Sequence, residues 1–241
     1  MKKKNILLFS FIGALAILIT FIIVLFTVII PKINDEREWE EFVRQYYNNK
    51  IETYEEENLK YDDYEVDVVF LGDSLTDGYD VKSFYSNLNV LNRGIGGDRV
   101  KDVITRLDTS IYRANPKVVV ILIGGNDVLA GHSQEYIINS IIRIIMNIKN
   151  NLHNTKIIVQ SFYPLSKDYA KHNSTMKSLN VVVQDVCSIF DVVFADIYDS
   201  LLDTSTNELS LSFTPDSVHL NNDGYEVVTS ILNPIIEELL G

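Results

Sequence analysis

The chain has 241 residues, 46% of them hydrophobic, which is enough for one catalytic domain with a sizeable core and a smaller additional segment. Its formal net charge of −12 argues against a nucleic-acid partner, because phosphate binding needs a basic face. Cys187 is the only cysteine, so no disulfide can form within the chain, and no Cys/His cluster has metal-ligand spacing. Cys187 lies in an apolar helical pattern, where a buried thiol is expected.

The first thirty residues form a separate segment. Residues 1–5 include three lysines, and the next twenty-five, Ile6–Ile30, carry no charge. Such a run can cross a bilayer core of roughly 30 Å with some tilt, whereas a cleaved signal peptide has a shorter apolar stretch of about 7–15 residues and a small-residue cleavage site. The sequence therefore predicts a single-pass transmembrane anchor over residues 6–30. The lysines favour residues 1–5 in the cytoplasm and the remainder outside the cell, with the reverse orientation and a cleaved signal as alternatives.

Residues 31–65 form an acidic juxtamembrane segment. Between Ile33 and Glu65 it has twelve acidic and four basic residues. Apolar and aromatic side chains nevertheless recur at the helical spacing i, i+3, i+4, i+7, i+8: Trp39, Phe42, Val43, Tyr46 and Tyr47. This stripe predicts an amphipathic helix over Trp39–Leu59 that packs on the following domain. The alternative is a solvated acidic spacer.

Residues 66–241 alternate between strand-like and helix-like patterns. The expected strands are Val66–Leu71, Asn89–Asn92, Val118–Ile123, Lys156–Ser161 and Val192–Asp196. The expected helices are Arg99–Leu107, Gln134–Asn150, Thr175–Ser188 and Asp223–Leu240. Such alternation predicts an α/β domain whose parallel sheet, of about five strands, is covered by helices on both faces.

Four short polar blocks interrupt these patterns. They are Gly72-Asp73-Ser74-Leu75, the loop from Asn92 to Asp98, Gly124-Gly125-Asn126-Asp127, and Asp216-Ser217-Val218-His219. The first three follow expected strands directly, and open α/β sheets place their ligands at the carboxyl ends of strands. We therefore expect the blocks to meet at one edge of the sheet.

Together the blocks offer the parts of an acyl-transfer site. A serine hydroxyl such as that of Ser74 needs a base, and the base needs a group that fixes its tautomer; His219 and Asp216 can serve, since both fit on one loop. A tetrahedral intermediate also needs hydrogen-bond donors for its oxyanion. Gly97 has no Cβ to block its N–H, and Asn126 offers a neutral amide.

In this order, the blocks resemble those of the SGNH (GDSL-type) esterase and acylhydrolase superfamily, over roughly Asp67 to the C-terminus. The resemblance implies a three-layer α/β/α flavodoxin-like fold that hydrolyses esters and thioesters without a cofactor. It implies that Ser74 is the nucleophile and that Asp216 and His219 are the acid and base. The oxyanion donors would be Ser74, Gly97 and Asn126.

Two competing motifs are excluded. The α/β-hydrolase nucleophile elbow needs glycine two residues after the serine, where this chain has Thr76. The glycines from Gly94 to Gly97 lack the spacing of a dinucleotide-binding loop.

Other polar residues and glycines near the blocks have simpler interpretations. Asp73 is expected to hold the Ser74 turn through backbone hydrogen bonds. Gly94 and Gly124 are expected to serve backbone geometry. We expect His132, His153 and His172 to face solvent, and Arg93 and Arg99 to pair with surface acids, although these arginines flank the Gly97 loop and could meet an anionic substrate.

The leading prediction is a membrane-tethered serine esterase that removes a small acyl group, such as acetate, from an envelope or extracellular carbohydrate. One alternative is a lysophospholipase or thioesterase that acts on lipid acyl chains. Another is a non-catalytic binding module at the cell surface that has the same fold. Such modules usually lose a catalytic residue, whereas all five positions are intact here.

Overall fold

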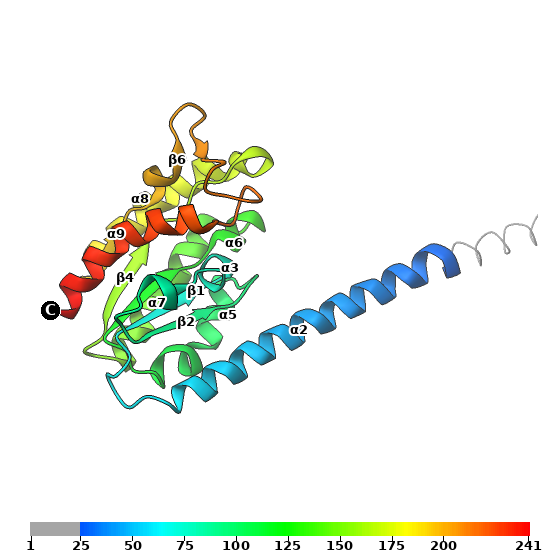
Figure 1. The fold of residues 1–241 in the computed structure, drawn as a ribbon. Helices are drawn as coiled ribbons and strands as arrows, with labels where there is room; N and C mark the ends of the chain where they lie inside the picture. The colour runs from blue at the N-terminus through cyan, green and yellow to red at the C-terminus, as the bar shows by residue number, and fades with distance from the viewer. Residues whose placement is uncertain (1–24) are drawn as a thin grey trace, which may run out of the picture. The chain divides into compact units, whose positions relative to one another are not determined.

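A five-stranded parallel sheet lies at the centre of residues 66–241. The structure, a computed structural model, describes residues 25–241. The strands are β1 (Val68–Gly72), β2 (Val90–Gly94), β3 (Val118–Leu122), β4 (Lys156–Gln160) and β5 (Val193–Ala195). Their order is β2-β1-β3-β4-β5 and every neighbouring pair is parallel (Figure 1). This is the strand order of flavodoxin-like sheets, so the predicted α/β class and parallel sheet are confirmed.

Both faces of this sheet are buried, and each has its own core. Every residue of β1 and β3 is buried. Val69 and Leu71 point into one hydrophobic cluster, whereas Val68 and Phe70 point into the other. This division follows from the two-residue period of a strand, and it explains why the strands read as continuous apolar runs rather than as alternating ones.

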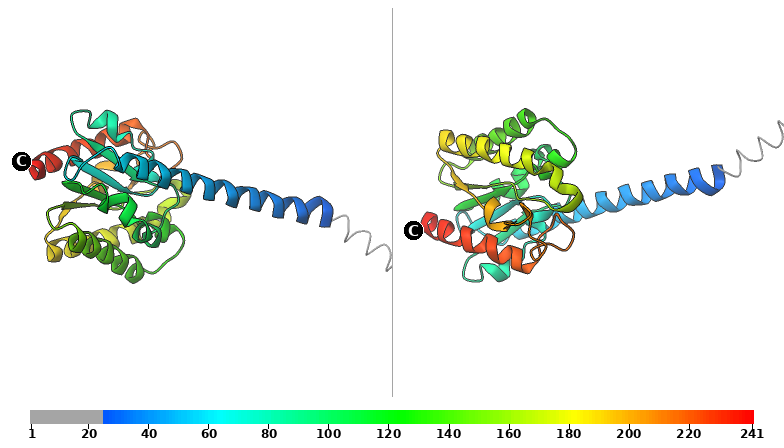
Figure 2. Two further views of the ribbon diagram at one scale, coloured as in Figure 1. Left: turned by 90° about the horizontal axis from the view of Figure 1, so that it is seen from below. Right: turned by 90° about the horizontal axis from the view of Figure 1, so that it is seen from above.

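Helices cover the two faces (Figure 2). One cluster contains side chains of α5 (Val100–Thr105), α7 (Gln134–Asn151) and α8 (Asn173–Phe190). The other contains side chains of α9 (Asn222–Leu240) and a group of buried tyrosines. In α7 the buried residues Ile137, Ile141, Ile144, Ile145 and Ile148 repeat at helical spacing.

Short elements connect these layers. They are α3 (Ser74–Asp77), α4 (Val81–Phe84), α6 (Gly125–Leu129), the hairpin strands β6 (Leu202–Asp203) and β7 (Glu208–Leu209), the π-helical turn Asp108–Tyr112, and the 3₁₀ turns Lys167–His172 and Tyr198–Leu201. The sequence did not predict them, because two to six residues are too few to display a period.

The described residues divide into two units after Lys50, within helix α2 (Ile30–Asn58). The first described unit is residues 25–50, where the Trp39 and Phe42 rings stack with centroids 5.7 Å apart. The second unit runs from Ile51 to Gly241 and contains the buried side chains Tyr54 and Asn58. The compact unit thus includes the end of the acidic segment.

Among residues 25–241, no helix combines the length and apolarity needed to cross a membrane. The predicted anchor, Ile6–Ile30, lies for the most part outside the described residues. Its last residues form the π-helical turn Leu25–Ile29 and the start of α2.

Candidate active site

Ser74 begins helix α3, directly after β1. Asp73 caps this short helix, and its Oδ1 accepts a hydrogen bond from the Leu75 N–H at 3.1 Å, as expected from the sequence. The turn packs tightly against β2, since a Cβ on Gly94 would lie 2.1 Å from the Asp77 nitrogen. Gly94 therefore has the geometric role predicted for it, and the backbone around Ser74 has little room to move.

Asp216 and His219 lie on one loop, stabilised by its own hydrogen bonds. Asp216 Oδ1 accepts from the backbone N–H groups of Val218 and His219, at 3.0 and 2.8 Å. Ser217 takes the left-handed backbone conformation, with φ 81°, and its N–H donates to Thr214 Oγ1 at 2.8 Å. These bonds present the His219 ring at a fixed angle.

The structure brings the three predicted residues together. His219 Nε2 lies 2.9 Å from Ser74 Oγ, and His219 Nδ1 lies 2.6 Å from Asp216 Oδ2. Burial acts to raise the pKa of Asp216, but hydrogen bonds from the His219 side chain and from backbone N–H groups outweigh it and lower the pKa. An ionised Asp216 favours the tautomer with a proton on Nδ1, which leaves Nε2 as an acceptor for the serine proton.

Asn126 and Gly97 come from the two middle blocks. Asn126 lies in α6, whose N-cap Gly124 has φ 112°, a conformation that glycine adopts readily. Asn126 Nδ2 donates to the Asp98 carbonyl oxygen at 2.9 Å and makes a longer contact of 3.5 Å with Asp73 Oδ2. Gly97 has φ 84°, is exposed, and has no atom within 4 Å of a Cβ placed on it. It is thus glycine because of its backbone conformation, and its surroundings are open.

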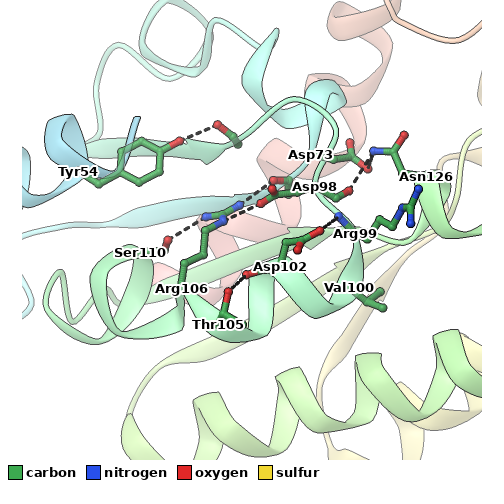
Figure 3. A network of polar contacts seen from close by, with 12 residues as sticks. Tyr54, Asp73, Asp98, Arg99, Val100, Asp102, Thr105, Arg106, Ser110 and Asn126 are labelled. Carbon is green, nitrogen blue, oxygen red and sulfur yellow. Dashed lines mark hydrogen bonds and ion pairs between the residues drawn. The ribbon is translucent and has the colours of Figure 1, made fainter. Parts of the chain in front are cut away.

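A buried arginine links these blocks (Figure 3). Arg106 Nε donates to Asp98 Oδ2 at 2.7 Å, one terminal nitrogen donates to the Gly72 carbonyl oxygen at 2.9 Å, and the other donates to Ser110 Oγ at 2.8 Å. Asp98 in turn accepts from Asn126 through its backbone oxygen. Arg106 therefore ties the end of β1 to the Gly97 loop and, through Asp98, to Asn126.

Two carboxyl groups in this region have raised pKa values. Burial raises the pKa of Asp73 to about 7, more than the Leu75 N–H lowers it, and the neighbouring Asp98 and Asp127 add to the rise. Burial likewise raises the pKa of Asp98 to about 6, against the lowering effect of Arg106. Both groups therefore change charge near neutral pH.

A small apolar cavity opens beside Ser74. The space within it that admits the centre of a water-sized sphere is about 30 Å³. The apolar side chains that enclose it are Leu75, Leu122, Leu129, Phe162, Tyr163, Leu165, Met176 and Val218, and Asp73, Gly125 and Asn126 complete its lining. One water needs about 10–15 Å³ on this measure, so the cavity has room for a group of about two heavy atoms.

Other sequence predictions for this region have mixed outcomes. Cys187 is buried in α8 as expected, and burial raises the pKa of its thiol to about 12. His153 is exposed and His172 is half-buried. His132 is half-buried, and its Nδ1 lies 2.9 Å from Oδ1 of the fully buried Asp127.

Arg93 corrects the expectation of a surface ion pair. Its side chain is fully buried and pairs with Glu57 of α2, while one terminal nitrogen donates to Asn58 Oδ1 at 2.9 Å. Arg99 is the N-cap residue of α5, and its backbone N–H donates to Asp102 Oδ2 at 3.0 Å. Sequence reasoning missed Arg106, since an arginine inside an amphipathic helical pattern normally faces solvent.

The chain is similar to known proteins. The family model described as GDSL-like Lipase/Acylhydrolase matches residues 70–227, more than half of the chain. Platelet-activating factor acetylhydrolase IB subunit alpha2 of Homo sapiens is 30% identical over 189 residues, which cover 74% of this chain and 79% of the relative.

Solved structures show the same fold at lower identity. A GDSL-like lipase from Bacteroides thetaiotaomicron is 23% identical, with a TM-score of 0.71 over 78% of this chain and 97% of the other. An acetylxylan esterase from Geobacillus stearothermophilus is 19% identical, with a TM-score of 0.60 over 72% and 95% of the two chains.

Proposed function

Because the chain belongs to the GDSL-like lipase/acylhydrolase (SGNH) family and is a hydrolase, we propose that it is a serine esterase in which Ser74, His219 and Asp216 act together. The observation that supports this most directly is the chain of two short contacts, 2.9 Å from Ser74 Oγ to His219 Nε2 and 2.6 Å from His219 Nδ1 to Asp216 Oδ2.

The proposed reaction has two halves. His219 Nε2 takes the hydroxyl proton as Ser74 Oγ attacks the ester carbonyl carbon, and the carbonyl oxygen becomes an oxyanion. His219 then gives the proton to the departing alcohol, and an acyl group remains on Ser74. A water molecule, deprotonated by His219, attacks this acyl-enzyme and releases the carboxylic acid. Gly97, Asn126 and the Ser74 N–H are the proposed oxyanion donors.

We propose an acetyl group as the acyl part of the substrate. The cavity beside Ser74 is apolar and has room for about two heavy atoms, which suits a methyl group and its carbonyl carbon and opposes the chains of a lysophospholipid or a long acyl thioester. Acetyl is also the acyl group in the names of the platelet-activating factor acetylhydrolase and the acetylxylan esterase. The two names differ in the compound that carries the acetyl group. For this chain we propose that this compound is a carbohydrate, so that the substrate is an acetylated carbohydrate.

The proposed place of the reaction follows from the N-terminal sequence. The uncharged run Ile6–Ile30 supports a single-pass anchor, and the lysines of residues 1–5 support a catalytic region outside the cytoplasm. An envelope or extracellular carbohydrate would then be within reach. The membrane is the proposed partner through this helix only.

Two measurements test the proposed function. A fluorophosphonate probe should label Ser74, and the Ser74→Ala variant should lose both labelling and ester hydrolysis while it keeps its thermal denaturation temperature. Nitrophenyl esters from acetate to palmitate, with acetylated sugars beside them, should show turnover that falls steeply beyond acetate. Labelling of another serine would overturn the mechanism, and a preference for palmitate would favour the lipid alternative.

A further inference from the structure

The last turns of α2 contact the loop that leads to Gly97. Tyr54 is 2% exposed, and its hydroxyl donates to the Gly94 carbonyl oxygen at 2.6 Å (Figure 3). Tyr54 lies outside residues 70–227, the range matched by the family model, whereas Gly94 lies inside it. We propose that Tyr54 is a positioning residue for the loop from Gly94 to Gly97. The end of α2 would then contribute to catalysis as well as to the fold. The proposal rests on the proposed function of Gly97 as an oxyanion donor.

A buried arginine holds Tyr54 in place. The Arg93 guanidinium lies over the Tyr54 ring, 4.4 Å from its centroid, and Arg93 is 0% exposed. Glu57 and Asn58, one turn further along α2, accept hydrogen bonds from its two terminal nitrogens. The planar guanidinium therefore fixes the orientation of this end of the helix relative to β2.

The energetics favour a positioning role over a purely stabilising one. Desolvation of a buried ion pair largely cancels its attraction, so apolar side chains of similar volume would stabilise this place as well or better. Arg93 also leaves its buried Nε without a hydrogen-bond partner among the described residues. What the polar arrangement adds is a defined direction for the Tyr54 hydroxyl, which an apolar contact would not specify.

Gly94 transmits this positioning to the active site. Its backbone lies so close to Thr76 and Asp77 of α3 that a Cβ would clash with them. The next residue, Ile95, donates its N–H to the Gly72 carbonyl oxygen at 3.2 Å and accepts from the Asp98 N–H at the same distance. Gly96 and Gly97 are thus held between two fixed points, and Tyr54 fixes the first of them.

The test uses the full-length chain and the variant Tyr54→Phe, which removes only the hydroxyl. Tyr64→Phe is the matched control, because Tyr64 also loses one hydroxyl contact, a bond of 3.2 Å from the exposed Asn154 side chain. For nitrophenyl acetate we expect Tyr54→Phe to lower kcat about 3- to 10-fold, the size expected for one neutral hydrogen bond, with KM nearly unchanged. Affinity for a phenylboronic acid, which forms a tetrahedral adduct on serine, should fall by a similar factor. Tyr64→Phe should match the wild type in each measurement.

Active-site titration separates positioning from stability. Fluorophosphonate labelling counts the folded sites, and kcat is calculated per labelled site. If Tyr54→Phe reduces the number of sites but not kcat per site, or changes neither, the proposal is wrong. If this variant does not fold, Glu57→Gln, which keeps the shape and removes the charge, is measured by the same criteria. A wild-type protein that is neither labelled nor active would instead overturn the proposed function.

Discussion

Asn126 makes two hydrogen bonds of unequal quality, and the weaker one involves the amide hydrogen that we propose as an oxyanion donor. One amide hydrogen is held by the Asp98 carbonyl oxygen at 2.9 Å, while the contact to Asp73 Oδ2 is 3.5 Å. An oxyanion can therefore replace Asp73 as the acceptor. We predict that Asn126→Ala lowers kcat by about 10²- to 10³-fold with a much smaller change in KM, because the donor acts mainly as charge develops. Steady-state kinetics on nitrophenyl acetate will check this, and a change in KM alone would assign Asn126 to substrate binding.

The buried Asp73 predicts a pH-dependent stability. Burial raises its pKa from the ordinary 3.8 to about 7, so between these values the folded state binds the proton more tightly than the unfolded state. The Asp73 contribution to the free energy of unfolding therefore falls as the pH rises from about 4 to about 7 and is constant above that. Relative to Asp73→Asn, the wild type should lose on the order of 2–4 kcal/mol across this range.

Denaturant unfolding of both proteins at a series of pH values measures this difference. Comparison of the two proteins removes the contributions of the other acidic groups. Asp216→Asn provides a control of opposite sign, because hydrogen bonds in the folded state lower the pKa of Asp216. Its stabilising contribution is lost as the pH falls through that lowered value. A pH-independent difference for Asp73→Asn would show that the carboxyl group is not shielded from water.

Among single residues, the sequence predicted those that belong to a motif. It missed those whose burial depends on tertiary packing. Ser74, Asp216 and His219 were found because their spacing and order are characteristic. Arg93 and Arg106 were not, since their burial depends on partners distant in the chain, Glu57 for one and Gly72 for the other. Nothing in the local pattern distinguishes them from surface arginines.

At the level of elements, two glycines should differ in what an added methyl group costs in stability. Gly94 lies where β2 contacts α3, and Gly97 lies in an open loop. A Cβ on Gly94 would lie 2.1 Å from the backbone nitrogen of Asp77, which cannot move aside as a flexible side chain would. Gly94→Ala should destabilise the fold by about 1–3 kcal/mol or more. Gly97→Ala meets no atom within 4 Å but must adopt φ 84°, so it should cost only about 1–2 kcal/mol.

Activity should rank these two variants in the opposite order. Per folded protein, Gly97→Ala should lose more turnover, because the added methyl group lies next to the proposed oxyanion N–H. Thermal denaturation and kcat per labelled site measure the two effects separately. Equal turnover per labelled site in Gly97→Ala and the wild type would argue against Gly97 as an oxyanion donor.

The long elements could be predicted from the sequence, and the short ones could not. The expected helix Gln134–Asn150 is observed as Gln134–Asn151, and Asp223–Leu240 as Asn222–Leu240. Both have several turns with a clear apolar face. The strand expected at Val192–Asp196 is only Val193–Ala195, which pairs with β4 at the edge of the sheet. Ser74 and Asn126 lie in helices of four and five residues, whose conformation depends on capping and tertiary contacts.

For the whole molecule, the sequence predicted a hydrolase domain over residues 66–241 with a preceding helix packed on it, and the second unit of the structure, Ile51–Gly241, includes the end of α2. Between Ile33 and Glu65, eight surplus negative charges favour a solvated spacer, whereas the apolar stripe predicted a helix over Trp39–Leu59 that packs on the domain. Tyr54 and Asn58 are buried nonetheless, and Glu57 balances the buried Arg93. Composition averaged over a segment did not show that one acid in it has a buried partner.

The last prediction concerns the proposed anchor, Ile6–Ile30, and the orientation of the chain. In a bacterial host, the full-length protein should fractionate with membranes and resist carbonate extraction, because twenty-five uncharged residues favour the bilayer core over water. Protease added to intact spheroplasts should remove the catalytic unit. A chain without residues 1–30 should be soluble and should react with the fluorophosphonate probe, since Ser74, Asp216 and His219 lie together in the unit Ile51–Gly241. Digestion only after lysis would reverse the orientation and place the substrate in the cytoplasm, and a mature N-terminus after Pro31 would replace the anchor with a cleaved signal.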